Sequence, residues 1–174
     1  MAKLHLKGDS VVADLGAGTG FYTYATAHHL NSLGKGGKVY AVDVQKSLLD
    51  RIKQEAERRG LANVQTIWAD IDRSGGIKIT DRVCDAVIIS NVLFQAENKE
   101  QFMAEAGRIL KPGGEMLLID WSESAGGLGP TREMLITQVQ VEQLLVKLKP
   151  NLNLDIETRF DAGGHHWGII LKKN

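Results

Sequence analysis

The sequence predicts a doubly wound α/β domain, in which a mostly parallel sheet carries helices on both faces. Short β-rich runs alternate with helical patterns along the chain, which is typical of right-handed βαβ crossovers. The run Ala86–Ile89 is continuously apolar, as expected of a strand covered on both faces. The chain has 174 residues, a length that suits one domain with one sizeable core. We therefore expect residues 1–174 to form a single domain.

The first half of the chain is predicted to hold three strands and two helices. Each strand is a short apolar run, and apolar residues recur at helical spacing between the strands. Gly16 ends the first strand and Gly60 stops the second helix. In chain order, the strands cover 10–15, 38–43 and 64–68, and the helices cover 20–32 and 45–59.

The second half is predicted to continue the alternation and to end in a hairpin. Lys-Pro-Gly-Gly at 111–114 is expected to break a helix before the next strand, and Pro150 is expected to close the last helix. Thr137 and Gln140 match a capping box. The turn at 161–164 predicts an antiparallel hairpin at one edge of the sheet. The strands cover 86–90, 115–121, 152–160 and 165–171, and the helices cover 98–110 and 138–149.

Charge and cysteine content disfavour several classes of function. Lys plus Arg equals Asp plus Glu at 21 each, whereas tight nucleic-acid binding needs clustered cations. The single cysteine, Cys84, excludes an intramolecular disulfide and a multi-thiolate metal site, so we expect a buried, unreactive thiol and no metal. No apolar stretch reaches the ~20 residues of a membrane span, and the N-terminus lacks the apolar core of a signal peptide. We therefore expect a cytoplasmic protein with no membrane span.

A glycine-rich turn, Asp14-Leu-Gly-Ala-Gly-Thr-Gly20, joins the first strand to the first helix. Glycines let the backbone turn sharply and approach a ligand closely. Amides at the start of a helix favour an anionic group such as a carboxylate. The turn departs from the dinucleotide fingerprint Gly-x-Gly-x-x-Gly, because Phe21 stands at the third glycine position. A structural turn without a ligand is the alternative interpretation.

Polar side chains also end the next three strands. Asp43 can accept both hydroxyls of a ribose, and it can instead cap the helix that starts at Gln45. Asp70 stands where a carboxylate can accept a hydrogen bond from an adenine amino group, with Asp72 as the alternative. Asn91 ends the fourth strand. Because ligands bind at the carboxyl ends of parallel strands, we expect these side chains around one crevice.

In their order and spacing, these segments resemble the class I S-adenosylmethionine-dependent methyltransferases, within them the small-molecule type related to quinone biosynthesis. The resemblance implies a Rossmann-like seven-stranded sheet of order 3-2-1-4-5-7-6 with strand 7 antiparallel. It covers nearly the whole chain, in the segments VVADLGAGTGFYT at 11–23, VYAVDV at 39–44, ADI at 69–71, CDAVIISNVLFQ at 84–95, ILKPGGEMLLID at 109–120 and HHWGIIL at 165–171.

The resemblance implies S-adenosylmethionine as the cofactor and S-adenosylhomocysteine as its product. On the methionine side, Gly16, Ala17 and Gly18 are expected to pass under the ligand. Asp14 is expected to support that loop and the ammonium group. Asn91 is expected to contact the methionine part near the methyl group.

On the adenosine side, the resemblance implies four further contacts. Asp43 is expected to hold the ribose hydroxyls, and Val44 to pack on the adenine. Asp70 and the backbone amide of Ile71 are expected to read the adenine edge.

Catalysis of methyl transfer depends mainly on positioning and electrostatics, because the cofactor carries the activated group. A general base helps where the acceptor must lose a proton. His165 and His166 are the candidates, because adjacent strand residues point to opposite faces and one can face the pocket; alternatively, both simply lie at a hairpin mouth. Asp120 is a further candidate, with loop capping as its alternative. Tyr22 and Phe94 are candidates to line the methyl pocket.

The methyl acceptor is predicted to be a small molecule, with O-, N-, C- and S-methylation all open. No Asn-Pro-Pro-Tyr run follows the fourth strand, since Asn91 is followed by Val-Leu-Phe. This disfavours amide or exocyclic amino nitrogens as acceptors. The single cysteine and the lack of a Pro-Cys pair disfavour arsenic and cytosine C5 methylation.

Two other functions remain open at this point. Fewer than ten residues precede the first predicted strand, whereas many relatives carry a lid helix there. A cofactor-binding module acting with a partner subunit is therefore one alternative. A nicotinamide-dependent oxidoreductase is the other, disfavoured by Phe21 and by the lack of a Tyr-x-x-x-Lys pair. No sustained apolar seam predicts an oligomeric state.

Overall fold

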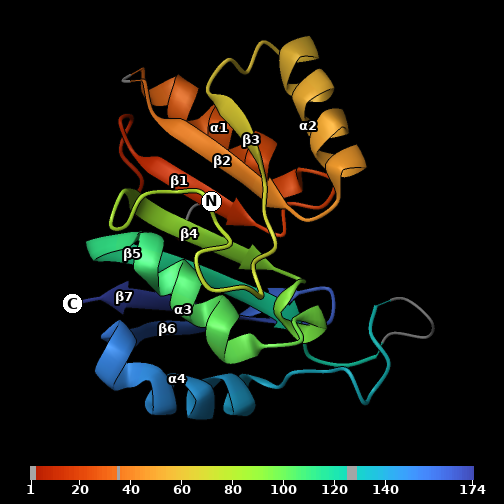
Figure 1. Cartoon of the computed structure of the whole chain (residues 1–174), viewed down its shortest axis with the longest axis vertical. Helices are drawn as coiled ribbons and strands as arrows, with labels where there is room; N and C mark the ends of the chain where they lie inside the picture. Colours follow the sequence, from red (N-terminus) through yellow and green to blue (C-terminus); the bar gives the residue numbers. More distant parts are fainter. Residues whose placement is uncertain (1–2, 35, 125–128) are drawn as a thin grey trace.

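The computed structural model, which describes residues 3–34, 36–124 and 129–174, has a seven-stranded sheet of order β3-β2-β1-β4-β5-β7-β6 (Figure 1). This confirms the predicted fold class and strand order. The strands are β1 (Val11–Leu15), β2 (Lys38–Asp43), β3 (Val64–Trp68), β4 (Cys84–Ser90), β5 (Leu110–Trp121), β6 (Leu154–Gly163) and β7 (His166–Lys173). The helices are α1 (Phe21–Leu33), α2 (Lys46–Arg58), the 3-10 helix η1 (Leu93–Gln95), α3 (Lys99–Ile109) and α4 (Gln138–Leu152).

The direction of the strands places a crevice at the centre of the sheet. The first five strands pair in parallel, and β7 pairs antiparallel with both β5 and β6. The chain runs outward from β1 to β3 on one side and from β4 to β6 on the other. The strand order therefore reverses between β1 and β4, where α/β sheets bind their ligands.

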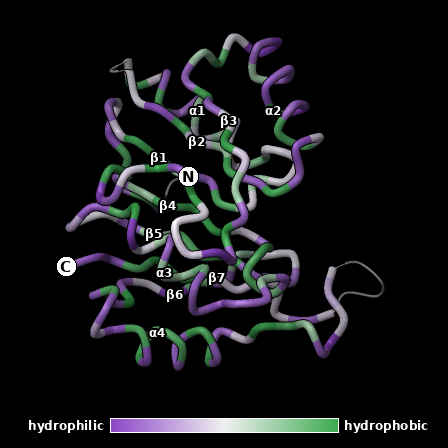
Figure 2. The backbone as a smooth tube through the Cα atoms, in the orientation of Figure 1, coloured by the Kyte–Doolittle hydropathy of each residue, from purple (hydrophilic) through white to green (hydrophobic). Residues whose placement is uncertain are grey.

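Helices cover both faces of the sheet, as predicted. Alternate residues of β4 enter two separate apolar clusters. Val87 packs in the cluster that holds Met103 of α3, whereas Ile88 packs in the cluster that holds Leu30 of α1. Buried residues of α2 recur at helical spacing, at Leu49 and Ile52, and the rest of this helix is largely hydrophilic (Figure 2).

Both breaks that were expected at a proline are wrong. β5 begins at Leu110 and includes the Lys-Pro-Gly-Gly segment as a bulge, since Leu110 pairs with Cys84 and Glu115 with Ala86. A bulge leaves extra residues unpaired, so it accommodates the proline within the strand. Helix α4 continues through Pro150 to Leu152. A proline so close to the end of a helix removes one hydrogen bond without cutting off a long following segment.

Other local predictions are confirmed. Both hydrogen bonds of the capping box between Thr137 and Gln140 are present. Cys84 is buried, and burial raises the pKa of its thiol to about 12. In the described parts of the chain, no helix has the length and apolar character needed to cross a membrane.

Candidate functional site

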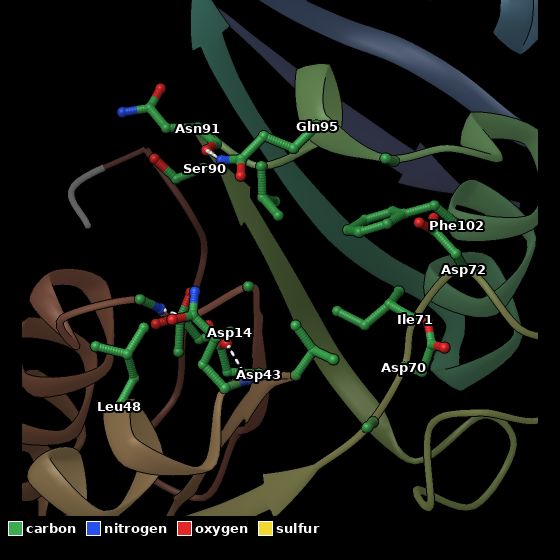
Figure 3. Close-up of a pocket in the computed structure, with 18 of the residues that line it drawn as sticks. Asp14, Asp43, Leu48, Asp70, Ile71, Asp72, Ser90, Asn91, Gln95 and Phe102 are labelled. Carbon is green, nitrogen blue, oxygen red and sulfur yellow. Dashed lines mark hydrogen bonds between the residues drawn. The ribbon is translucent and has the colours of Figure 1, made fainter. Parts of the chain in front are cut away.

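A cavity of about 890 Å³ lies at the carboxyl ends of the central strands (Figure 3). The glycine-rich loop after β1 and the segments after β2, β3 and β4 form its walls. The nine residues predicted to bind the cofactor all line it: Asp14, Gly16, Ala17, Gly18, Asp43, Val44, Asp70, Ile71 and Asn91. Pairing of the parallel strands explains this convergence, because it aligns their carboxyl ends along one edge of the sheet.

The glycine-rich loop is held against β2 by its own backbone. Gly16 and Ala17 donate N–H bonds of 2.8 and 3.0 Å to the carbonyl of Val42. Gly16 has a φ of 72°, and a Cβ there would lie 2.5 Å from Cγ2 of Val92. Gly18 has a φ of 54°, and a Cβ there would meet no atom closer than 3.9 Å. The loop therefore needs glycine at residue 16 for close packing, and glycine at residue 18 leaves space open beside the cavity.

Asp14 joins the end of β1 to the first turn of α1. Its carboxylate is buried and accepts a 2.5 Å hydrogen bond from the Thr23 hydroxyl. Burial raises the pKa of Asp14 to about 6, although hydrogen bonds from Thr23 oppose the rise. The carboxylate of Asp43 adds to the rise. A cationic ligand group beside Asp14 would favour its ionised form.

Asp43 connects the two loops that follow β1 and β2. Its Oδ2 accepts a 2.9 Å bond from the Gly18 amide, and its Oδ1 accepts a 2.8 Å bond from the Gln45 amide. The second bond orders the turn before α2, whose N-cap is Gln45. A carboxylate can accept about four hydrogen bonds, so acceptor capacity for two ribose hydroxyls remains.

The segment after β3 carries two aspartates, Asp70 and Asp72, whose carboxylates have different partners. Asp70 forms an ion pair of 2.8 Å with Arg73 and is partly exposed. Asp72 accepts a 3.0 Å bond from the Glu97 amide on Oδ2. Its Oδ1 is buried and has no partner among the described residues. Asp72, the alternative to Asp70 in the sequence, therefore keeps one buried oxygen without a partner among the described residues, whereas Asp70 is ion-paired.

A hydrogen-bond network that the sequence did not predict anchors the loop after Asp72. Arg108 of α3 donates 2.9 Å bonds to the carbonyls of Ile77 and Ile79. Glu105 accepts a 3.0 Å bond from the Gly75 amide. The sequence does show that Glu105 and Arg108 lie on one face of a helix. It does not show which backbone groups they bind, because those groups are distant in the sequence.

Asn91 ends β4 in an unusual backbone conformation. Its φ is 55°, in the left-handed region, and its amide donates a 2.9 Å bond to the Ile119 carbonyl. The Asn91 carbonyl accepts a 3.2 Å bond from Nε2 of Gln95. Oδ1 of its side chain is buried without a partner in the described parts of the chain. Asparagine tolerates this left-handed conformation better than most residues, and Asn91 stands on the wall of the cavity.

The three predicted proton acceptors do not line this cavity. Asp120 is buried and accepts bonds from the amides of Trp121 and Phe94, at 2.9 and 3.1 Å, so it has the capping role foreseen as its alternative. Burial raises the pKa of Asp120 to about 6. His165 is exposed and pairs with Glu123 at 2.5 Å.

His166 is the first residue of β7 and pairs with Trp121 at the carboxyl end of β5. Its ring packs at 4.2 Å from the ring of Trp121, and its Nδ1 lies 3.2 Å from the Gly163 carbonyl. Its Nε2 is buried without a partner among the residues described. His166 is therefore the one imidazole of the pair with an unused buried nitrogen.

The two aromatic residues predicted to line the methyl pocket, Tyr22 and Phe94, lie at different cavities. Tyr22 lines the cavity, and burial raises the pKa of its phenol, opposed by a hydrogen bond with Ser90. Phe94 lines a neighbouring cavity instead. Within the described ranges, no group of three or more His, Cys, Asp or Glu side chains is placed to hold a metal ion.

Comparison with known proteins gives sequence relatives over most of the chain. A family model described as "Methyltransferase domain" matches residues 6–173. The ubiquinone/menaquinone biosynthesis C-methyltransferase UbiE of Francisella tularensis subsp. novicida is 31% identical over 118 residues, which are 67% of this chain and 44% of the relative. UbiE of Hydrogenovibrio crunogenus is 29% identical over 68% of this chain and 44% of the relative. The chain thus spans less than half the length of these curated relatives.

Solved structures share the fold. A SAM-dependent methyltransferase from Aquifex aeolicus superposes with a TM-score of 0.84 at 23% identity, covering 98% of this chain and 86% of that one. The [4+2]-cyclase SpnF superposes with a TM-score of 0.80 at 16% identity, covering 99% of this chain and 77% of that one. The second case illustrates that the fold alone does not fix a reaction. On the family match and the strand order together, the chain belongs to the methyltransferase domain family, with the class I fold.

Proposed function

We propose that this chain is an enzyme, a single methyltransferase domain that transfers the methyl group of S-adenosylmethionine to a small-molecule acceptor. The observation that carries the proposal is the convergence of the nine predicted cofactor-binding residues on one cavity at the carboxyl ends of the parallel strands. Asn91 lines this cavity after β4, and Asp72 lines it after β3. These two walls suit the methionine end of the cofactor and the adenine end, respectively.

The charge of the cavity supports a cationic ligand. Its described lining carries five carboxylates and one guanidinium, those of Asp14, Asp43, Asp70, Asp72, Glu97 and Arg73. Arg73 is itself paired with Asp70. Carboxylates attract the sulfonium and ammonium groups of S-adenosylmethionine, whereas they repel the pyrophosphate of a nicotinamide dinucleotide. The cavity therefore favours a methyltransferase over the oxidoreductase alternative.

The proposed contacts divide between the two ends of the cavity. On the methionine side, Asp14 and Asn91 offer acceptors for the ammonium group, above the loop of Gly16, Ala17 and Gly18. On the adenosine side, Asp43 offers acceptors for the ribose hydroxyls, and Val44, Ile71 and Leu48 offer apolar contact for the adenine ring. Asp70 or Asp72 accepts from the adenine edge.

When bound, S-adenosylmethionine supplies an electrophilic methyl group, so that the acceptor atom forms the new bond to carbon as the sulfur–carbon bond breaks and S-adenosylhomocysteine leaves. The residues of the chain bind and orient both reactants. Where the acceptor loses a proton, we propose His166 ahead of His165 and Asp120. Its Nε2 is buried without a partner among the described residues, whereas His165 pairs with Glu123 and Asp120 accepts from two backbone amides.

Calorimetric titration tests the proposal with S-adenosylmethionine, S-adenosylhomocysteine and NAD as ligands. We expect both adenosyl ligands to bind and NAD not to bind. Asp43→Ala should weaken adenosyl binding by about tenfold or more, because charge-assisted hydrogen bonds to the ribose are lost. Asp50→Ala, which removes an exposed carboxylate of α2, is the matched control and should leave binding unchanged. Binding of NAD alone would overturn the proposal.

The acceptor is sought by measuring release of S-adenosylhomocysteine in the presence of candidate small molecules. Quinols belong in this screen, because the curated relatives are named as ubiquinone/menaquinone C-methyltransferases. The second candidate function, a cofactor-binding module for a partner subunit, is favoured by the absence of the predicted proton acceptors from the cavity lining. Tight cofactor binding without turnover on any acceptor would support that alternative.

A further inference from the structure

Trp68 is the last residue of β3, the strand at one edge of the sheet. The two residues that follow it, Ala69 and Asp70, line the cavity proposed to bind the cofactor (the cofactor cavity). Among the described residues, Trp68 is not part of that lining, and it is 52% exposed. It therefore lies next to the site in the chain without facing the ligand.

The indole of Trp68 connects β3 to the segment that follows β2. Its Nε1–H donates a 2.8 Å hydrogen bond to the carbonyl of Val44. Val44 comes directly after Asp43, where β2 ends, and directly before Gln45, the N-cap of α2. The indole bond thus ties the turn between β2 and α2 to the neighbouring strand.

Val44 is the residue of this turn that offers apolar contact to the ligand. It lines the cofactor cavity and is 55% exposed. In the proposed function, its side chain packs on the adenine ring. Dispersion attraction between two surfaces is lost over a gap of less than 1 Å. A small displacement of Val44 would therefore weaken packing on the base.

Asp43, the neighbour of Val44, is held by other bonds. It is buried, and its carboxylate accepts from the amides of Gly18 and Gln45 at 2.9 and 2.8 Å. Its carbonyl accepts a 3.1 Å bond from the Ala69 amide. These three bonds do not involve the indole of Trp68. The proposed ribose contact and the proposed adenine contact are thus positioned by different hydrogen bonds.

The ring of Trp68 makes a second contact with the start of α2. The ammonium of Lys46 lies 5.4 Å from the ring centroid, within the range of a cation–π interaction. Phenylalanine would keep an aromatic ring at residue 68 and would remove the N–H donor. Trp68→Phe therefore isolates the hydrogen bond to Val44 from the ring contact.

We propose that Trp68 is a positioning residue for cofactor recognition, whose indole N–H holds Val44 in place for packing on the adenine base. It acts through Val44 and does not touch the cofactor. This proposal rests on the proposed methyltransferase function and adds a residue outside the cavity lining that sets the affinity for the base. The bond is neutral and partly exposed, so we expect an effect of about threefold on affinity.

NMR titration of the whole chain tests the proposal with two probes, S-adenosylhomocysteine and S-ribosylhomocysteine. The second probe keeps the ribose and homocysteine parts and has a hydroxyl in place of adenine. Trp68→Phe should weaken S-adenosylhomocysteine binding about threefold and leave S-ribosylhomocysteine binding unchanged. Asp43→Ala should weaken both probes, because both carry the ribose. Trp121→Phe, the same substitution at the end of β5 and outside the cavity lining, is the matched control and should change neither.

A double-mutant cycle tests whether Trp68 acts through Val44. Val44→Ala should also weaken S-adenosylhomocysteine binding and spare S-ribosylhomocysteine. In the Val44→Ala background, Trp68→Phe should have little further effect, because the side chain that it positions is already truncated. The indole N–H signal of Trp68, identified by its absence from the Trp68→Phe spectrum, should shift with S-adenosylhomocysteine and not with S-ribosylhomocysteine. A residue that only stabilises the fold would produce neither result.

The outcomes separate this proposal from the proposed function. Unchanged S-adenosylhomocysteine affinity in Trp68→Phe, equal weakening of both probes, or additive effects of Trp68→Phe and Val44→Ala would overturn the positioning role alone. If Trp68→Phe does not fold, an indole signal of the parent chain that responds equally to both probes would overturn it as well. A parent chain that binds no S-adenosylhomocysteine would overturn the methyltransferase function, and the role of Trp68 with it.

Discussion

Two buried aspartates, Asp14 at the end of β1 and Asp120 near the end of β5, respond to burial in the same way and differ in their surroundings. Burial raises the pKa of each to about 6. Asp14 accepts from the Thr23 side chain and lines the cofactor cavity, whereas Asp120 accepts from the backbone amides of Phe94 and Trp121 outside it. A perturbed carboxylate at a strand end therefore does not identify a ligand contact by itself. The hydrogen-bond partners distinguish the two roles.

The largest expected effect concerns the loop that places Asp14 in the cavity. Gly16→Ala should lower the free energy of unfolding by about 3 kcal/mol or more, because left-handed strain adds to overpacking against Val92. Gly34→Ala is the matched control, since Gly34 has a φ of 71° and open space around its Cβ position. It should cost only about 1 kcal/mol. Urea unfolding measures both variants. If Gly16→Ala and Gly34→Ala lose the same free energy of unfolding, close packing is not the reason for glycine at residue 16.

Replacing either aspartate by asparagine should change the pH dependence of the free energy of unfolding in the same way. A carboxylate whose folded pKa is raised destabilises the folded state once it ionises, so its cost appears as the pH rises from about 4 to about 6. Asp14→Asn and Asp120→Asn should each gain up to about 3 kcal/mol of stability relative to the parent as the pH rises from about 4 to about 7. Urea unfolding at several pH values measures this difference. A difference that shrinks with rising pH would contradict the raised pKa.

Ligand binding should separate the two aspartates. Asp14→Asn should weaken S-adenosylhomocysteine binding by about tenfold at neutral pH, because an ionised acceptor for the ammonium group is lost. Asp120→Asn should leave the affinity within about twofold, because Asp120 accepts from backbone amides of η1 and β5 and does not line the cofactor cavity. Calorimetry measures both, and circular dichroism checks that each variant is folded. Equal losses of affinity would show that Asp120 also reaches the ligand.

The smallest expected effect lies at the hairpin mouth beside Asp120. Glu123 and His165 form an ion pair in which both side chains are more than half exposed. Glu123→Gln should therefore change the free energy of unfolding by less than about 1 kcal/mol. Thermal unfolding measures it, and a loss of several kilocalories would mean that this pair anchors the β6–β7 turn.

The sequence was most informative where function follows from local order along the chain. Residues at the ends of parallel strands converge without any knowledge of side-chain packing, so Asp43 and Asn91 were placed beside one cavity. Strand order followed from the family resemblance. The hairpin was also predicted, and its two histidines lie at the hairpin mouth, outside the lining of the cofactor cavity, as the alternative interpretation had it.

Packing between distant segments was not predictable in the same way. The bond from Glu97 to Asp72 and the bonds from Arg108 to the loop after β3 join residues more than twenty positions apart. The neighbouring cavity lined by Phe94 also joins distant segments, because residues 133–136 before α4 form another part of its lining. The end of α4 was predicted wrongly at Pro150, because a proline breaks a helix interior but is tolerated in a final turn.

The division of η1 between two cavities has a consequence for mutagenesis. In a 3-10 helix, successive residues point about 120° apart, so substitutions of Phe94 and of Gln95 change the walls of different cavities. Variants confined to residue 94 would therefore leave the described lining of the cofactor cavity unchanged.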